Sequence, residues 1–244
     1  LTETNIADLA DTQVAAFTTT QIAALSTTNA SALADTQIAA LGATQIAAFS
    51  TTQIVALNET DVDELSETQV AALTTTQVKA FLETQLDALA DTQIAALTTT
   101  QLQAMSTSRL ASLDETQMAA LTTTQIGALS TAQLKAFSAA NLSALDATQV
   151  GALSASQVSA LTSTQLNALD AADMAEFTTT QVAGMATTQV RDLSETNLAA
   201  MTETQIAALT ANQVKAVSST ALAGLAETQI AAMTTTQVQA LSAT

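Results

Sequence analysis

Apolar residues recur along this chain with a period of eight. Every eighth residue from Leu1 to Leu241 is Leu, Phe, Met or Val, and all five Phe fall at these positions. If this anchor is position one of an octad, position six is aliphatic or Met in every octad except the one that contains Ala30. Position five is mostly Gln, position four mostly Thr, position eight mostly Ala, and position two mostly Ser, Thr, Asp or Asn. The register never slips, so we expect residues 1–244 to form one continuous array of about 30 octads without an internal domain boundary.

The octad fits neither one long helix nor one strand. In a continuous α-helix eight residues advance about 800°, which overshoots two turns by about 80°, so the apolar stripe would spiral around the helix. In a β-strand, positions one and six have opposite parity and point to opposite faces, and Ala and Gln are poor strand formers. The pattern therefore predicts one very short helix in each octad, followed by a sharp reversal of the chain.

The polar positions agree with a helix that begins just after position two. Ser50-Thr51-Thr52-Gln53 and Thr122-Thr123-Thr124-Gln125 have the form of a capping box, in which the cap oxygen accepts the Gln N–H and the Gln side chain reaches back to the cap N–H. Half of all acidic residues lie at position three, in the first helical turn, where the helix dipole favours them by about 0.3–1 kcal/mol each. Four octads have Ala in place of the cap and an acid directly after it, which we expect to replace the cap: Ala10, Ala34, Ala90 and Ala226.

The remaining positions predict which side faces the interior. Position six and the next position one are three residues apart, so pairs such as Ile22 and Leu25 share one face of the short helix. All six Met lie at these two positions, which indicates a role in the core. Position seven varies freely and includes Lys79, Lys135 and Arg191, so we expect it to face water.

An octad of this kind needs neighbours. A helix of about six residues is far below the ~12–15 residues needed for marginal stability in water, so stacking must supply the free energy. We therefore predict an all-α solenoid of very short helices, one per octad, in which nearest-neighbour contacts dominate. If its turns stack at ~9 Å, the array makes a rod of ~70–100 Å.

A longer period accompanies the octad. The block TTTQ recurs with gaps of 24 or 56 residues, beginning at Thr18, Thr74, Thr98, Thr122, Thr178 and Thr234. The 56-residue offset, which also separates Lys79 from Lys135, suits a superhelix of three to four helices per turn. Duplication of DNA segments of these lengths explains the same spacing.

The composition narrows the classes of function. Twenty-two acidic against five basic residues give a net charge of −17, which repels nucleic acid and anionic membrane surfaces. No apolar run approaches the ~18 residues that a bilayer span requires. The absence of Cys removes disulfides and thiolate metal sites. Because Leu1 lies inside the repeat and is not an initiating Met, we expect the chain to be a fragment or a processed product.

We assign no catalytic, cofactor-binding or metal-binding residues, and no cofactor. Acyl transfer needs an activated nucleophile, and the chain has neither His nor Cys, so we predict that it is not an enzyme. The densest acidic cluster is Glu59 with Asp61-Val62-Asp63-Glu64; a calcium site is conceivable there, but no calcium-binding motif is present, and we interpret the cluster as a solvated face. Rows such as Thr18-Thr19-Thr20 suggest the hydroxyl arrays of ice-binding proteins, but here they form a cap and a first helical turn.

The unit L-[ST]-x-T-Q-[IVL]-x-A, as in the stretch from Leu121 to Leu129, resembles the Thr/Gln/Ala-rich octapeptide arrays of very large secreted bacterial surface and adhesin-like proteins. The resemblance covers the whole chain and implies an extracellular stalk, filament or spacer. It carries over no site residues, because the family has no catalytic motif to match.

Two hypotheses about function follow. The first is an extracellular or cell-surface structural rod, which joins end to end with copies of itself or with flanking repeats of a longer chain. The second is a binding module whose position-seven residues and acidic ridges hold a cationic ligand or calcium, or, by its Thr rows, ice. Neither includes nucleic acid or a membrane span as a partner.

Overall fold

The computed structural model of the chain describes residues 2–241, and this part contains helices and no strand. The chain forms two compact units, Leu1–Leu121 and Thr122–Thr244. The helices of the first unit are α1 (Glu3–Ala7), α2 (Asp11–Ala15), α3 (Thr19–Ala23), α4 (Thr27–Ser31), α5 (Asp35–Ala40), α6 (Ala43–Ile46), α7 (Thr51–Ala56), α8 (Glu59–Asp63), α9 (Glu67–Ala72), α10 (Thr75–Ala80), α11 (Glu83–Asp87), α12 (Asp91–Ala96), α13 (Thr99–Ala104), α14 (Thr107–Ala111) and α15 (Glu115–Ala120). Those of the second are α16 (Thr123–Ala128), α17 (Thr131–Ala136), α18 (Ala139–Ser143), α19 (Ala147–Gly151), α20 (Ala155–Ala160), α21 (Ser163–Ala168), α22 (Ala171–Glu176), α23 (Thr179–Gly184), α24 (Thr187–Arg191), α25 (Glu195–Ala199), α26 (Glu203–Ala208), α27 (Ala211–Ala216), α28 (Ser219–Ala223), α29 (Glu227–Ala231) and α30 (Thr235–Leu241).

The predicted capping boxes are present. Ser50 Oγ accepts the Gln53 N–H at 3.2 Å while Gln53 Oε1 accepts the Ser50 N–H at 2.6 Å. The pair Thr122 and Gln125 has the same two bonds, at 3.2 and 2.7 Å. In these octads the first N–H groups of the short helix are satisfied by residues of the same octad, which is what a helix of five or six residues needs to begin.

The expectation that an acid replaces the cap where position two is Ala is wrong. In all four octads the Gln side chain accepts the N–H of the Ala, but no side-chain oxygen accepts the N–H of the Gln, either from Ala10, Ala34, Ala90 and Ala226 or from the acid that follows. After Ala10 and Ala34, the N–H of the Gln bonds to the carbonyl of the Ala itself, at 2.8 Å in both octads. A tighter first turn takes the place of the missing hydroxyl.

The reversal between helices consists of two extended residues, positions one and two of the octad. Leu41 ends α5 with φ −68° and ψ 140°, and Gly42 precedes α6 with φ −73° and ψ 156°. No residue of the described part has a positive φ. Because these angles suit any L-amino acid, the reversal needs no glycine, and position two is free to carry a capping side chain.

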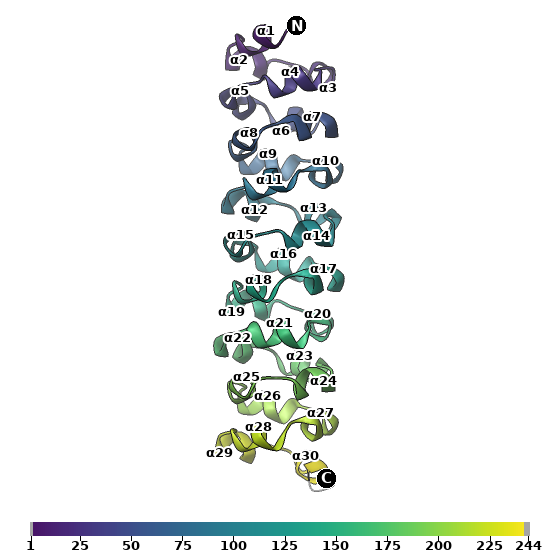
Figure 1. Cartoon of the computed structure of the whole chain (residues 1–244), viewed down its shortest axis with the longest axis vertical. Helices are drawn as coiled ribbons and strands as arrows, with labels where there is room; N and C mark the ends of the chain where they lie inside the picture. Colours follow the sequence, from purple (N-terminus) through teal and green to yellow (C-terminus); the bar gives the residue numbers. More distant parts are fainter. Residues whose placement is uncertain (1, 242–244) are drawn as a thin grey trace. The chain divides into compact units, whose positions relative to one another are not determined.

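Within each unit the helices stack at a regular interval. In the first unit α2 packs against α5 and α5 against α8; in the second, α19 packs against α22 and α20 against α23 (Figure 1). Hydrogen bonds between stacked turns join residues 28 and 31 apart, as from Gln37 Nε2 to the carbonyl oxygens of Leu9 at 2.6 Å and Ile6 at 3.1 Å. Since 28 residues are three and a half octads, the prediction of a solenoid with three to four short helices per superhelical turn is confirmed. The 56-residue offset in the sequence corresponds to two such turns.

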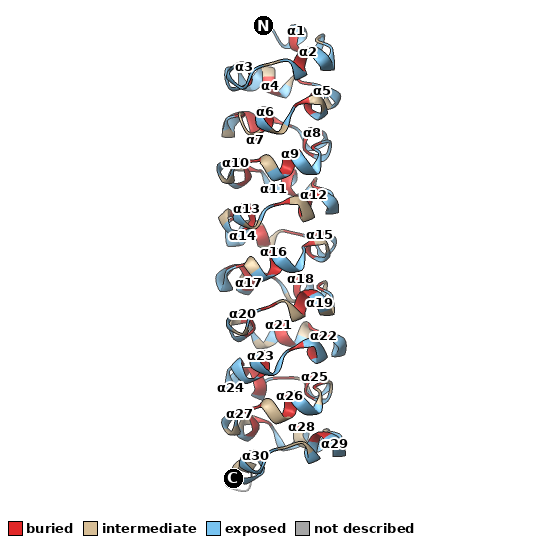
Figure 2. Cartoon of the chain, turned by 180° about the vertical axis from the view of Figure 1, so that it is seen from behind, coloured by how far each residue is buried: buried red, intermediate tan, exposed pale blue. Residues whose placement is uncertain are grey.

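The core of each unit lies on the inner side of the stacked helices (Figure 2). Position-six side chains such as Ile54 and Leu134 are completely buried, and anchors such as Phe81 and Leu121 are nearly so. Five of the six Met are also buried, as the sequence predicts: Met105, Met118, Met174, Met185 and Met201. Lys79, Lys135 and Arg191 at position seven are exposed, again as predicted.

Candidate functional site

The most distinctive structural feature of the octad is the Gln at position five, which bonds in two directions. In the octad of Gln53, Oε1 accepts the N–H of the cap residue Ser50, while Nε2 donates to the carbonyl oxygens of Ile22 at 3.0 Å and Leu25 at 2.7 Å, one superhelical turn earlier. The Gln53 side chain is only 1% exposed. The buried amide of Gln53 thus caps the start of its own helix and also donates hydrogen bonds to carbonyls at the end of a helix in the preceding turn.

We call the line of position-five side chains and the carbonyls they meet the glutamine seam. It recurs in the second unit, where Gln165 Nε2 donates to the carbonyls of Leu134 at 3.0 Å and Phe137 at 2.8 Å. The last carbonyls of a helix have no partner within that helix, and a buried carbonyl without a donor costs about 1–3 kcal/mol. The seam supplies these donors from the next turn, so it holds successive turns in register.

Sequence reasoning found the capping half of this arrangement and missed the other half. A capping box accepts Glu as readily as Gln, yet position five of this chain never holds Glu. Only an amide has an N–H₂ group to donate, so the absence of Glu was the available signal that position five faces acceptors.

Asn197 shows how the seam adapts to a shorter side chain. Its Nδ2 donates to the carbonyls of Leu166 at 2.9 Å and Leu169 at 3.2 Å, the same two positions that a Gln would reach. The N–H of its cap residue Ser194 bonds instead to Asn167 Oδ1 at 2.7 Å, a position-seven side chain of the preceding turn.

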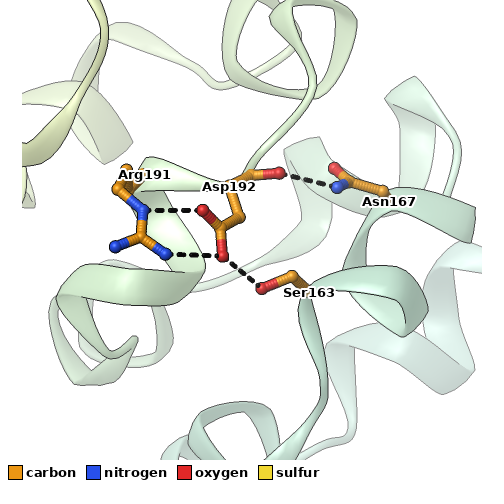
Figure 3. A network of polar contacts seen from close by, with 4 residues as sticks. All are labelled: Ser163, Asn167, Arg191 and Asp192. Carbon is orange, nitrogen blue, oxygen red and sulfur yellow. Dashed lines mark hydrogen bonds and ion pairs between the residues drawn. The ribbon is translucent and has the colours of Figure 1, made fainter.

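Asn167 belongs to a small polar network on the surface of the second unit (Figure 3). Its Nδ2 donates to the Asp192 carbonyl at 2.7 Å, and the Asp192 carboxylate accepts from the Ser163 hydroxyl at 3.2 Å and from the Arg191 guanidinium at 2.7 and 3.1 Å. The hydrogen bond from Arg191, and then its charge, lower the pKa of Asp192. Arg191 and Asp192 are well exposed, so the pair contributes little to stability, and the network joins α21 to α24 chiefly through Asn167.

Asp61 is the clearest departure from the seam, and it corrects the interpretation of the acidic cluster as a solvated face. Glu59, Asp63 and Glu64 are exposed, but Asp61 occupies position five and is completely buried. Its Oδ2 accepts the Asn58 N–H at 2.8 Å, whereas Oδ1 has no hydrogen-bond partner among the described residues. The pKa of Asp61 is raised from 3.8 to about 6 as the net result of burial, which raises it most, the Asn58 N–H, which lowers it, and the nearby Asp35 carboxyl, which raises it.

Asp173 repeats this departure in the second unit. It also occupies position five, is 4% exposed and accepts the N–H of its cap residue Asp170 at 3.0 Å. Burial raises the pKa of Asp173, the Asp170 N–H lowers it, and the charges of Asp170 and Asp146 raise it. The two buried acids are 112 residues apart in the sequence, twice the 56-residue offset.

Arg109 is a third exception at position five. Its Nη1 is buried and has no hydrogen-bond partner among the residues that the structure describes. The residue 27 positions earlier, Leu82, stands at a cap position and is 44% exposed. In the first unit the seam is therefore interrupted at Asp61 and at Arg109, where neither side chain donates to the carbonyls of the preceding turn as a Gln does.

Acidic side chains gather on the outside of the first unit. Burial raises the pKa of Asp87, and the charges of Glu83, Asp114 and Glu59 raise it further. These residues come from α8, α11 and the cap of α15, so they line successive turns. Within residues 2–241, however, no three acidic side chains are placed so that together they could hold a metal ion.

The two edges of the described repeat differ in chemistry. At one edge the seam residues Asn5, Gln13 and Gln21 are exposed, because no earlier turn is present for their amides to meet. At the other edge Ile230 is 44% and Val238 51% exposed, although the equivalent side chains Ile206 and Val214 are buried. One edge thus offers amide donors, and the other offers apolar side chains with the carbonyls beside them.

The comparisons with known proteins agree with a tandem repeat. Two overlapping stretches, residues 94–131 and 128–163, match the family model described as ALTTAQ repeat. No curated protein matches the chain. None of the helices in the described part has the length and the apolar character that a membrane crossing requires. The chain is therefore similar to ALTTAQ repeats in its middle third and follows the same octad throughout.

Proposed function

We propose that the chain is a structural repeat protein, a spacer or filament scaffold at the cell surface, and that it performs no catalysis. The observation that carries this proposal is the glutamine seam. In most octads the inward-pointing polar residue binds the neighbouring turn, as Gln53 and Gln165 do, instead of lining a site for a ligand. The feature that repeats along the chain is a set of hydrogen bonds that joins one superhelical turn to the next.

A spacer must hold two points at a fixed separation. The chain contains no Cys, so K135C and K215C place spin labels at two exposed positions of the second unit without background. Pulsed electron paramagnetic resonance should give one narrow distance distribution that stays constant up to the onset of unfolding in urea. A broad distribution in native buffer would show a flexible tether and would contradict the spacer.

The proposed partner is another edge of the same repeat, carried by a second copy or by flanking octads of a longer chain. The exposed amides of Gln13 and Gln21 are the donors that, one turn further on, bind carbonyls, and Ile230 and Val238 are side chains that a further turn would cover. Sedimentation velocity should show association that increases with concentration and is weakened in I230E and V238E. Sedimentation as a monomer at all concentrations would remove self-association from the proposal.

The surface location is supported by the resemblance of the octads to those of secreted surface proteins. It is tested by treating intact source cells with a protease and blotting with an antibody against the chain. Loss of the signal from intact cells is expected. A signal that disappears only after the cells are lysed would place the protein inside and overturn this part of the proposal.

A further inference from the structure

Asp61 holds a position in the seam that requires a hydrogen-bond donor. By the register of the seam, a side chain at this position is directed at the carbonyls 31 and 28 residues earlier, those of Ala30 in α4 and of Leu33 just after α4. Helix α8 also packs against α5. Asn197 has a side chain of the same size and shape at the same position, and its Nδ2 lies 2.9 and 3.2 Å from the two corresponding oxygens. In Asp61 both terminal side-chain atoms are oxygens, so neither can donate to a carbonyl unless it carries a proton.

An ionised carboxylate at this point has no hydrogen to offer. Asp61 Oδ2 is occupied by the Asn58 N–H, and Oδ1 is buried without a partner in the described part of the chain. Carbonyl oxygens carry partial negative charge, so an ionised Oδ1 repels both of them in surroundings from which water is excluded. A protonated carboxyl, in contrast, donates its O–H to a carbonyl as the amide does.

The helices around Asp61 carry charges of one sign only. Helix α8 and its C-cap carry Glu59, Asp63 and Glu64, and α5 carries Asp35. The helices of the following turn carry Glu83 and Asp87 on α11 and Asp91 on α12. Every charged residue on these elements is acidic, so all of them oppose the ionisation of Asp61.

We propose that a proton on Asp61 closes the seam between the end of α4 and α8, and that loss of this proton opens it. Uptake of one proton converts the Asp61 carboxylate to a carboxyl group, whose Oδ1–H bonds to the Leu33 or Ala30 carbonyl. The first unit therefore contains one contact between turns that depends on pH, among seam contacts made by Gln that do not. A proton requires no room beyond that which the buried side chain already occupies.

The sign of the effect follows from linkage. Burial raises the pKa of Asp61 from 3.8 to about 6 in the folded chain. The contribution of the protonated Asp61 carboxyl to closing the seam is fully present below pH 3.8 and is lost as the pH rises through about 6. From pH 7.5 to pH 5, these values give a change of about tenfold in the closing equilibrium.

Hydrogen exchange of the 244-residue chain measures this equilibrium directly. Peptides that cover α4 with the residues up to Leu33, and α8, should gain about tenfold in protection from pH 7.5 to pH 5, after correction for the intrinsic exchange rate. In D61N the amide replaces the proton, so protection should be high at both pH values. D61Q restores the common seam residue and should behave like D61N, which guards against a folding defect in either variant.

D63N is the matched control, because it removes one acidic charge from the same helix at an exposed position. It should keep the pH dependence of the wild type. Equal pH dependence in wild type and D61N would overturn the proposal. So would protection that calcium restores at pH 7.5 in the wild type but not in D61N, because the site would then hold a metal ion instead of a proton.

Discussion

Asn167 Oδ1 accepts the N–H of Ser194 at 2.7 Å, although the two residues belong to different turns of the second unit. In most octads this N–H is bound by the Gln at position five of the same octad, but here that residue is Asn197. Asn197 uses its shorter side chain for the carbonyls of Leu166 and Leu169 and does not reach back to the cap N–H. In the octad of Asn197 only one of the two capping-box bonds is made by the octad itself, from the Asn197 N–H to Ser194 Oγ. Asn167 supplies the acceptor for the other, the Ser194 N–H.

This relationship predicts that Asn167 and Asn197 are energetically coupled. N167A removes the acceptor for the Ser194 N–H and the donor to the Asp192 carbonyl, so it should cost about 1 kcal/mol in the free energy of unfolding by urea. In the N197Q background the longer amide serves Ser194 itself, and N167A should then cost clearly less. A double-mutant cycle measures the difference.

S159A is the control for this cycle, because Ser159 is an exposed position-seven residue one octad earlier. Its effect on the free energy of unfolding should be near zero in both backgrounds. If N167A costs the same in the wild type as in the N197Q background, the two side chains act independently and the proposed coupling is absent.

The seam itself predicts that Gln and Glu are not interchangeable at position five. Q165E keeps an oxygen for the Thr162 N–H but sets a second oxygen against the carbonyls of Leu134 and Phe137. It should cost about 2–3 kcal/mol at pH 7, the size of a lost buried hydrogen bond with an uncompensated charge, and less at pH 4. Chemical denaturation at the two pH values measures both effects.

Q21E is the matched control for Q165E. Gln21 makes the same capping bonds with Thr18 but is exposed at the edge of the first unit. Its replacement should change the stability by less than about 0.5 kcal/mol. A small cost for Q165E would show that position five contributes through the capping box alone, which Glu also forms. A large cost for Q21E would show that the penalty for Glu does not come from the carbonyls of the seam.

The local structure was predictable from the sequence because each octad carries its own signals. Ser50 and Gln53 define the start of a helix, and Ile54 with Leu57 defines its inner face, all within eight residues. The contact of Gln53 with Leu25 was not predictable in this way, because it depends on the pitch of the superhelix and joins residues 28 apart. For the same reason the sequence placed Asp61 in a solvated cluster: its neighbours in sequence are exposed, and its burial is set by the preceding turn.

Leu82 predicts a gain in stability at a single exposed position. It occupies position two, is 44% exposed, and offers no cap oxygen to α11, although the Leu82 N–H is bound by Gln85. L82T supplies the hydroxyl that Thr74 has in the preceding octad and removes exposed apolar surface. It should stabilise the chain by about 0.5–1 kcal/mol in thermal or urea unfolding.

The reverse exchange, T74L, is the control and should destabilise the chain by a similar amount. If L82T is neutral while T74L is costly, the exposed Leu82 side chain makes a favourable contact that outweighs the missing cap.

Asp173 predicts a pH effect in the second unit that parallels the one at Asp61. Burial, and after it the charges of Asp170 and Asp146, raise the pKa of Asp173 against the effect of the Asp170 N–H. Its protonated form therefore contributes stability that is present below the ordinary value of 3.8 and is lost as the pH rises through the raised pKa. D173N replaces the proton with an amide, so at pH 7 it should stabilise the chain by about 1–2 kcal/mol, the value of a buried hydrogen bond regained. The difference between D173N and the wild type, measured by urea unfolding, should shrink as the pH falls toward 4.

E176Q removes a charge from the same helix at an exposed position and should show a much smaller difference with no such trend. A difference that stays constant with pH would mean that Asp173 remains ionised in the folded chain, and that the second unit tolerates a carboxylate in its seam.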